Sequence, residues 1–287
     1  MACPLCDKNH AAPSWLGSTF YRGKEFPYVQ CLSCGSLYCD PMPDHKTLAR
    51  MYGSDYGTSF AYQTDDSKER LQVMALLKSL NGGIFIDYGC GGGGLLIEAA
   101  RLNWQAVGVE FDRKVAERTE KETRSRVFAR DQLGSLNGPR ADVLHLGDVI
   151  EHLTELNSQM PEILRLVKPG GLLVARGPLE GNPNLFLAMV RLGRSVRRGP
   201  RTEMAPYHVL LATAKGQRLL FQRFGLKELD FQVREASWPA SERLTFSNVR
   251  RPRSLGLFLL RRLSQAISRL GPAGLGNRYF YVGRMNG

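Results

Sequence analysis

The chain has 287 residues, 43% of them hydrophobic, and a formal net charge of +12 at pH 7. No run of about 18 apolar residues occurs, so no membrane-spanning helix is expected, and six cysteines are too few for a disulfide scaffold in a chain of this length. The first ten residues, MACPLCDKNH, lack the basic and apolar regions of a signal peptide. We therefore expect a cytoplasmic globular protein with one large domain, or one domain and a small module.

The N-terminal segment 1–44 contains two C-x-x-C units, CPLC at 3–6 and CLSC at 31–34. One thiolate pair from each unit completes a closed tetrahedral zinc site, and a module of this size needs a metal to fold. The sequence therefore predicts a zinc-ribbon-like module, unless the four thiols are unrelated. Cys39 and Cys90 fall outside this spacing and are interpreted as small apolar residues rather than ligands. The expected zinc ligands are Cys3, Cys6, Cys31 and Cys34.

Residues 45–80 carry helical periodicity and are expected to form a linker helix and a packing helix. From 81 to 287, apolar strand-like runs alternate with helical segments, which predicts a doubly wound α/β domain with a seven-stranded, mostly parallel sheet. Two inserts, at about 179–214 and 234–277, are predicted to form a cap. The predicted strands are IFIDYG, AVGVE, RVFAR, ADVLHLGD, GLLVARGP, KELDFQV and RYFYVGR.

The glycines in IFIDYGCGGGG, residues 84–94, follow the first of these strands. Gly89, Gly91 and Gly94 satisfy the G-x-G-x-x-G dinucleotide pattern, which alone is a weak signal. The same stretch also fits D-x-G-x-G-x-G through Asp87 and Gly93. A fixed carboxylate beside a pyrophosphate is unfavourable, but it suits the ammonium of an amino-acid group. A glycine-rich turn without a ligand is the alternative.

The order of motifs along residues 70–287 resembles class I S-adenosylmethionine-dependent methyltransferases. The resemblance is carried by four segments, FIDYGCGGGG, VGVE, GDVIEHL and LRLVKPGGLLVARGP. It implies a Rossmann-like domain that binds S-adenosylmethionine. The paired cysteines, followed by CDPMPD and MYGSDYG, are similar to zinc-containing sugar C-methyltransferases, while VIEHL is similar to quinone-pathway O-methyltransferases. Neither similarity identifies the acceptor.

The resemblance also implies which residues contact the cofactor. Asp87 and the glycine loop would contact the methionine part, and Glu110 at the end of the second strand would accept both ribose hydroxyls, unless it is only an exposed turn carboxylate. Asp131 and Gln132 follow the third strand, where the family recognises adenine. The expected cofactor-binding residues are Asp87, Gly89, Cys90, Gly91, Gly93, Glu110, Phe111, Asp131, Gln132 and Asp148.

Methyl transfer is an in-line displacement, so alignment of the acceptor supplies much of the catalysis, but a hydroxyl or carbon-acid nucleophile also needs a proton acceptor. Histidine is the natural base near neutral pH. His152 follows the fourth strand, and Tyr207 with His208 follows the fifth, so these three are the candidate catalytic residues. Each could instead be structural. His145 lies within a strand and is expected to be a core residue.

The positive charge is concentrated in residues 191–287, which hold 19 Lys and Arg against 5 Asp and Glu. Its two densest stretches, 191–201 and 250–262, fall in the predicted cap inserts, which predicts an anionic acceptor or surface near the active site. We favour a small anionic acceptor, either a nucleotide sugar or a glycan or secondary-metabolite intermediate, whose phosphates arginines could bind.

RNA gripped by the zinc module and the basic cap is the first alternative. A membrane-bound, lipid-linked acceptor is the second, because residues 254–270 carry an apolar stripe beside three arginines. The stripe comprises Leu255, Leu259, Leu263, Ala266 and Leu270, and the arginines are Arg261, Arg262 and Arg269. This helix could also simply pack on the sheet. A non-catalytic scaffold that retains a cofactor pocket is a further possibility of a different class.

Overall fold

The computed structural model describes residues 1–51, 67–135, 140–185, 188–189, 202–236, 252–270 and 274–286. The chain divides into two compact units whose segments interleave along the sequence. The first unit comprises 1–65, 178–219 and 232–279, and the second comprises 66–177, 220–231 and 280–287. Among the described helices, none combines the length and the apolar character needed to cross a membrane.

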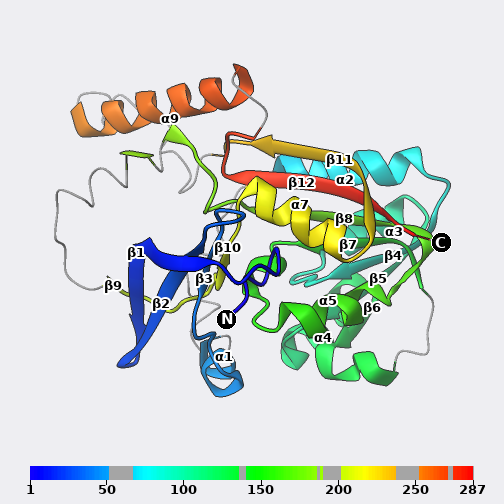
Figure 1. Cartoon of the computed structure of the whole chain (residues 1–287). Coiled ribbons are helices and arrows are strands. Elements are labelled where there is room, and N and C mark those ends of the chain that lie inside the picture. Colours follow the sequence, from blue (N-terminus) through cyan, green and yellow to red (C-terminus); the bar gives the residue numbers. More distant parts are fainter. Residues whose placement is uncertain are drawn as a thin grey trace. The chain divides into compact units, whose positions relative to one another are not determined.

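Seven of the described strands form one sheet (Figure 1). The strand order is β11-β12-β8-β7-β4-β5-β6, and β4 pairs in parallel with both β5 and β7, as do β5 with β6 and β7 with β8. The predicted doubly wound, mostly parallel sheet is confirmed. Its strands are β4 (Gly83–Tyr88), β5 (Trp104–Glu110), β6 (Arg126–Ala129), β7 (Ala141–Gly147), β8 (Val167–Pro178), β11 (Leu226–Arg234) and β12 (Arg278–Met285).

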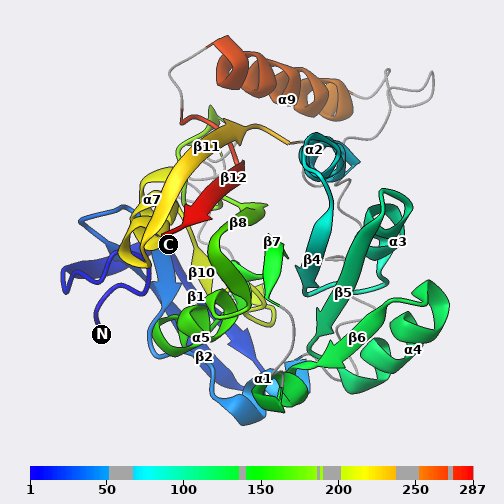
Figure 2. The same cartoon turned by 90° about the vertical axis from the view of Figure 1, so that its right-hand side faces the viewer.

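Helices cover both faces of this sheet, which is why its strands are apolar along their length rather than alternating. Figure 2 shows α3 (Gly94–Arg101) and α4 (Arg113–Thr123) on one side of the strands and α5 (Leu156–Leu164) on the other. The helix α2 (Ser67–Ser79) precedes β4. Fully buried core side chains join these layers, among them Phe85, Leu96, Val143 and Val174.

Polar residues interrupt the buried strands. His145 lies in β7 with 1% of its surface exposed, and Arg176 lies in β8 with 7% exposed. A buried imidazole or guanidinium requires hydrogen-bonding partners, because an unpaired polar group away from water is costly. Both side chains therefore belong to a polar cluster rather than to the apolar core.

The first unit, which we call the N-terminal unit, contains a five-stranded sheet with the order β10-β3-β2-β1-β9. The hairpin of β1 (Ala11–Tyr21) and β2 (Lys24–Cys31) turns at Arg22 and Gly23, both with positive φ, as a two-residue hairpin turn requires. β3 (Leu37–Cys39) continues this sheet. Two short strands from a segment assigned by sequence to the cap insert complete it, β9 (Thr202–Glu203) and β10 (Leu210–Leu211).

The same unit carries α1 (His45–Met51) and α9 (Pro252–Leu270), and α7 (Ala214–Arg223) begins in it. Thr213 caps α7, since its hydroxyl accepts a hydrogen bond from the backbone N–H of Gly216 at 3.0 Å. The basic stretch predicted at 191–201 lies outside the described residues, whereas most of the second basic stretch lies in α9.

Candidate functional site

The glycine loop after β4 contains three glycines with positive φ, Gly89, Gly91 and Gly93. A Cβ atom on Gly93 would lie 2.5 Å from Cγ2 of Thr123 on α4, so close packing requires glycine there. A Cβ on Gly91, by contrast, would have no atom of the described residues within 4 Å. The backbone at Gly91 is therefore open to a ligand.

Cys90 lies between these glycines, but its side chain turns into the core. A Cβ on the neighbouring strand residue Gly108 would lie 2.8 Å from the Cys90 sulfur, and the residue is 8% exposed. Burial raises the pKa of this thiol, so it stays protonated. Only the backbone of Cys90 is placed to serve the loop.

Glu110 at the end of β5 fixes the open part of this loop. Its carboxylate accepts hydrogen bonds from the backbone N–H of Gly91 at 2.9 Å and from that of Phe111 at 2.7 Å. On the other side of the same residue, the Thr119 hydroxyl donates to the Gly91 carbonyl at 2.7 Å. The Gly91 backbone is thus held from both sides, which preorganises the loop for a ligand.

Asp87 is 4% exposed, and its Oδ1 atom lies 2.7 Å from Nδ1 of His145 on the adjacent strand. Nε2 of the same imidazole lies 3.2 Å from Nε of Arg176. A guanidinium can only donate, so Nε2 must accept and Nδ1 must carry the hydrogen that His145 donates to Asp87. Three neighbouring strands, β4, β7 and β8, each contribute one member of this buried chain.

Arg176 extends the chain to two further carboxylates. Its Nη1 atom lies 3.0 Å from Oδ2 of Asp148, just after β7, and 3.4 Å from Oε2 of Glu69 on α2, which is fully buried. We name Asp87, His145, Arg176, Asp148 and Glu69 the buried polar cluster. Three of its five members are carboxylates, which favour a cationic ligand group beside the cluster.

Asp131 and Gln132, which are predicted to contact adenine, follow β6, and Phe111, a further predicted cofactor-binding residue, follows β5. Phe111 is 52% exposed, and Cζ of Arg130 lies 5.5 Å from the centre of its ring. In the turn η3 (Arg130–Ser135), Asp131 forms an ion pair with Arg113, and Gln132 accepts a hydrogen bond from the Ala129 N–H at 2.9 Å. Phe111 therefore offers a flat apolar surface, whereas Asp131 and Gln132 already hold partners within the chain.

The candidate bases belong to different units. His152 ends the turn η4 (Ile150–His152) after β7, and its backbone N–H donates to the Val149 carbonyl. Tyr207 and His208 lie between β9 and β10 in the N-terminal unit. Nδ1 of His208 lies 2.8 Å from Oε2 of Glu180, and the buried Tyr28 hydroxyl donates to the His208 carbonyl at 2.8 Å. His208 thus has a carboxylate partner that orients its ring.

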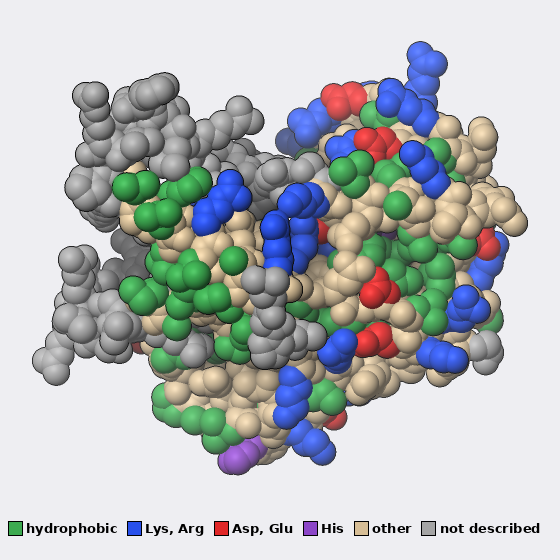
Figure 3. Space-filling model, turned by 90° about the horizontal axis from the view of Figure 1, so that it is seen from above, with side chains coloured by type: hydrophobic (Ala, Val, Ile, Leu, Met, Phe, Trp, Pro, Cys, Tyr) green, Lys and Arg blue, Asp and Glu red, His purple; other side chains and the backbone are tan. Residues whose placement is uncertain are grey.

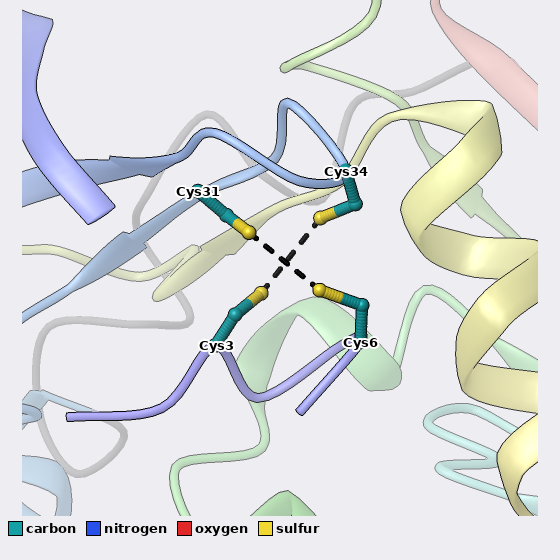
Figure 4. Close-up of side chains that lie close together, drawn as sticks. All are labelled: Cys3, Cys6, Cys31 and Cys34. Carbon is teal, nitrogen blue, oxygen red and sulfur yellow. Dashed lines mark hydrogen bonds between the residues drawn. The ribbon is translucent and has the colours of Figure 1, made fainter. Parts of the chain in front are cut away.

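The four paired cysteines converge in the N-terminal unit, with their sulfur atoms pointing toward one another (Figure 4). The sulfur atoms of Cys3 and Cys34 lie 3.7 Å apart and those of Cys6 and Cys31 lie 3.5 Å apart. Tetrahedral zinc with sulfur ligands at about 2.3 Å would separate them by about 3.8 Å. The donor set and its spacing therefore fit a closed zinc site.

The surroundings of this cluster favour a fixed geometry. The contact with the Cys3 sulfur lowers the pKa of the Cys34 thiol to about 5. The Thr213 hydroxyl donates to the Cys34 carbonyl at 2.7 Å, which holds the second cysteine turn to the start of α7. Cys39, by contrast, is fully buried away from the cluster, and burial raises the pKa of its thiol to about 12.

Sequence reasoning did not identify Arg176, Glu69 or Glu180 as site residues. It expected His145 to be a core residue and missed its polar role. A signal was present for two of them, because an arginine in LLVARGP and a histidine in DVLHLG stand inside otherwise apolar strands. Glu69 and Glu180 gave no signal, since carboxylates are common on helix surfaces and in loops.

Comparisons with known proteins find a methyltransferase domain in this chain. A family model described as a methyltransferase domain matches residues 62–230. A curated relative, a ubiquinone biosynthesis O-methyltransferase of Alkalilimnicola ehrlichii, is 29% identical over 122 residues, which is 40% of this chain and 49% of that protein. The matched segment thus spans about half the length of this relative.

Solved structures with a similar fold have low sequence identity. The plantazolicin methyltransferase BamL, in complex with a triazolic desmethylPZN analog and SAH, is 12% identical with a TM-score of 0.49, over 84% of this chain and 95% of that chain. The N-methyltransferase NodS of Bradyrhizobium japonicum in complex with S-adenosyl-L-homocysteine is 12% identical with a TM-score of 0.47, over 84% and 96% of the two chains.

Proposed function

Because the chain belongs to the methyltransferase-domain family, we propose that it transfers the methyl group of S-adenosylmethionine to a small anionic acceptor, a nucleotide sugar or a glycan or secondary-metabolite intermediate. The sequence resemblance to class I methyltransferases is confirmed by the family match. The observation that carries the proposal is the buried polar cluster beside the glycine loop. It brings several carboxylates close to a loop with open space for a ligand at Gly91.

The residues present fit this cofactor. S-adenosylmethionine, when bound, supplies an electrophilic methyl group on a sulfonium and also carries an ammonium, and both cations suit the carboxylates of the buried polar cluster. The open space at Gly91 would admit the methionine part, and Glu110 would accept hydrogen bonds from the ribose hydroxyls. Phe111 would stack against the adenine.

We assign the role of proton acceptor to His208, supported by its carboxylate partner. Glu180 accepts a hydrogen bond from Nδ1 of the ring, which leaves the lone pair on Nε2. In this tautomer, Nε2 takes up the proton that the methyl acceptor loses. The imidazolium that forms is stabilised by the Glu180 carboxylate. His152 is the second candidate.

The choice of an anionic acceptor rests on the basic surplus of residues 191–287. A few arginines can bind a pyrophosphate or carboxylate through paired hydrogen bonds. They would not favour binding of the cofactor, because the cofactor is itself cationic.

We also propose that Cys3, Cys6, Cys31 and Cys34 hold a structural zinc ion. The support is their mutual distances and their closed, four-sulfur donor set, which leaves no ligand position for a substrate. The metal therefore stabilises the N-terminal sheet and takes no part in methyl transfer.

The decisive experiment is methyl transfer from radiolabelled S-adenosylmethionine into a host-cell extract, followed by separation into RNA, solvent-extractable lipid and small water-soluble anions. Label in the small anionic fraction is expected. Label that disappears only after RNase treatment, or label found in the lipid fraction, would replace the proposed acceptor. The Asp87→Ala variant, which should transfer no label, is the control for the site.

A further inference from the structure

The helix α9 has its polar and apolar sides reversed relative to an ordinary packing helix. Ser264 is 3% exposed, and its hydroxyl donates to Glu235. Ser268, one turn further along, donates to the Leu275 carbonyl. Its small polar residues therefore bind the rest of the N-terminal unit, which is where an amphipathic helix normally places its apolar side.

Three large apolar side chains of α9 are exposed instead. Leu259 is 56% exposed, Leu263 is 54% exposed and Ile267 is 38% exposed. They follow one another at intervals of four residues, which places them in one row along the helix. A row of exposed leucine and isoleucine on a 19-residue helix is an apolar surface that a partner would cover.

Positive charge borders this row. Arg262 and Arg269 are exposed beside it, and Cζ of Arg262 lies 5.2 Å from the centre of the Phe258 ring. The helix contains four arginines and no acidic residue. Figure 3, which looks onto the side that carries α9, shows hydrophobic side chains gathered there with Lys and Arg next to them.

We propose that α9 binds flat on an anionic phospholipid bilayer. The row of Leu259, Leu263 and Ile267 enters the boundary between headgroups and acyl chains, while Arg262 and Arg269 bind lipid phosphates. A helix of this kind lies in the interface and does not cross it. The proposal concerns a surface of the N-terminal unit and does not depend on the identity of the methyl acceptor.

Charge decides between a bilayer and a second copy of the chain. A two-fold symmetric contact through the row would bring the arginines of both copies together without any acidic residue of the helix to pair with them. Like charges at such a contact are destabilising. An anionic leaflet complements both the apolar row and the arginines.

The test is co-sedimentation of the full chain with phosphatidylcholine vesicles that contain 0 or about 30% phosphatidylglycerol. We expect binding to the anionic vesicles, little binding to pure phosphatidylcholine, and weaker binding as salt is raised. The double variant Leu259→Gln/Leu263→Gln should bind at least about tenfold more weakly. Arg262→Gln/Arg269→Gln should bind anionic vesicles about tenfold more weakly than the wild type does, whereas its binding to pure phosphatidylcholine should not change.

A matched control is available in the other unit. Leu71 on α2 is 68% exposed and Leu229 on β11 is 47% exposed, so Leu71→Gln/Leu229→Gln removes two exposed leucines outside α9. This variant should bind vesicles like the wild type. Equal binding of all variants, or no binding of the wild type to anionic vesicles, would overturn the proposal.

Two further measurements separate lipid from protein contact. In the Leu263→Trp variant, brominated lipids should quench additional fluorescence if the row enters the bilayer; absence of that quenching would contradict the proposal. Analytical ultracentrifugation should give the same mass for the wild type and Leu259→Gln/Leu263→Gln. If the wild type is a dimer and Leu259→Gln/Leu263→Gln is a monomer, the row is instead an interface between two copies.

Discussion

Nδ1 of His145 lies 2.7 Å from Oδ1 of Asp87, and both side chains are almost completely buried between neighbouring strands. The carboxylate predicted from the glycine motif to meet the cofactor therefore already has one fixed partner. Arg176 fixes that partner in turn through Nε2 of the imidazole. The orientation of Asp87 thus depends on a residue two strands away.

Removal of Arg176 should destabilise the domain strongly. Arg176→Met leaves Glu69, which is fully buried, without its guanidinium, so the free energy of unfolding should fall by about 3 kcal/mol in urea titrations. Glu69→Gln in the same background should restore part of the loss. The exposed Arg101→Met should change stability by less than about 0.5 kcal/mol. Additive effects of Glu69→Gln and Arg176→Met would show that the two charges are not coupled.

Two glycines of the loop should respond differently to alanine. Gly93→Ala places a Cβ 2.5 Å from Thr123 at a positive φ, so it should lower the free energy of unfolding by at least about 2 kcal/mol. Gly91→Ala also stands at a positive φ but meets no neighbouring atom, so it should cost less stability than Gly93→Ala and should also weaken S-adenosylmethionine binding. Thermal unfolding and calorimetry separate the two effects. Gly92→Ala, without a positive φ or a close neighbour, is the control, and equal losses of affinity at Gly91 and Gly93 would contradict this view.

Glu110→Ala should weaken S-adenosylmethionine binding at least about tenfold, because it removes a charged acceptor and frees the Gly91 N–H. Calorimetry gives the affinity, and the zinc content should stay unchanged. Glu117→Ala removes an exposed carboxylate from α4 and should bind normally. Normal affinity of Glu110→Ala would remove Glu110 from the binding site.

Cys31→Ser should abolish zinc binding and lower the thermal stability of the N-terminal unit, since the site loses one of four ligands. Metal analysis by mass spectrometry and unfolding in the presence of a chelator measure both. Cys39→Ala removes a buried thiol that lies outside the cluster, so it should retain zinc. One zinc per chain in Cys31→Ser would refute the ligand set.

Stability should depend on pH through Asp142. Burial alone would raise the pKa of this carboxyl, but hydrogen bonds from the Ile84 N–H and the Lys168 ammonium outweigh it and leave the pKa below its usual value. A depressed folded-state pKa contributes stability above the unfolded value of about 3.9, and this contribution is lost as the pH falls through the folded value. Urea unfolding between pH 2 and pH 7 should therefore show a shallower acid dependence for Asp142→Asn than for the wild type.

The strands could be predicted from sequence because parallel strands buried on both faces are short apolar runs, and ADVLHLGD and GLLVARGP are both recovered as β7 and β8. The strands β9 and β10 could not. Each has two residues and no periodicity, and each is defined by partners far away in the sequence. Pairing of this kind leaves no local pattern.

The candidate site shows the same division. The glycine spacing predicted the loop, but it could not show that Glu110 binds the Gly91 N–H or that Arg176 reaches Glu69, because both contacts depend on how strands and helices pack. For α9, the sequence predicted an apolar stripe of leucines. It could not show that Ser264 and Ser268 face the protein and leave Leu259 and Leu263 outside.

The N-terminal sheet pairs strands that are made at very different times during translation. Leu210 of β10 pairs with Tyr38 of β3, 172 positions earlier, so on the ribosome β3 waits roughly ten to thirty seconds for this neighbour. The four cysteines, by contrast, are all present once residue 34 has been made. Binding of the proposed zinc ion is therefore the first event that can fix the nascent hairpin, long before its edge strands exist. Zinc added during translation should therefore stabilise this hairpin earlier than zinc added afterwards.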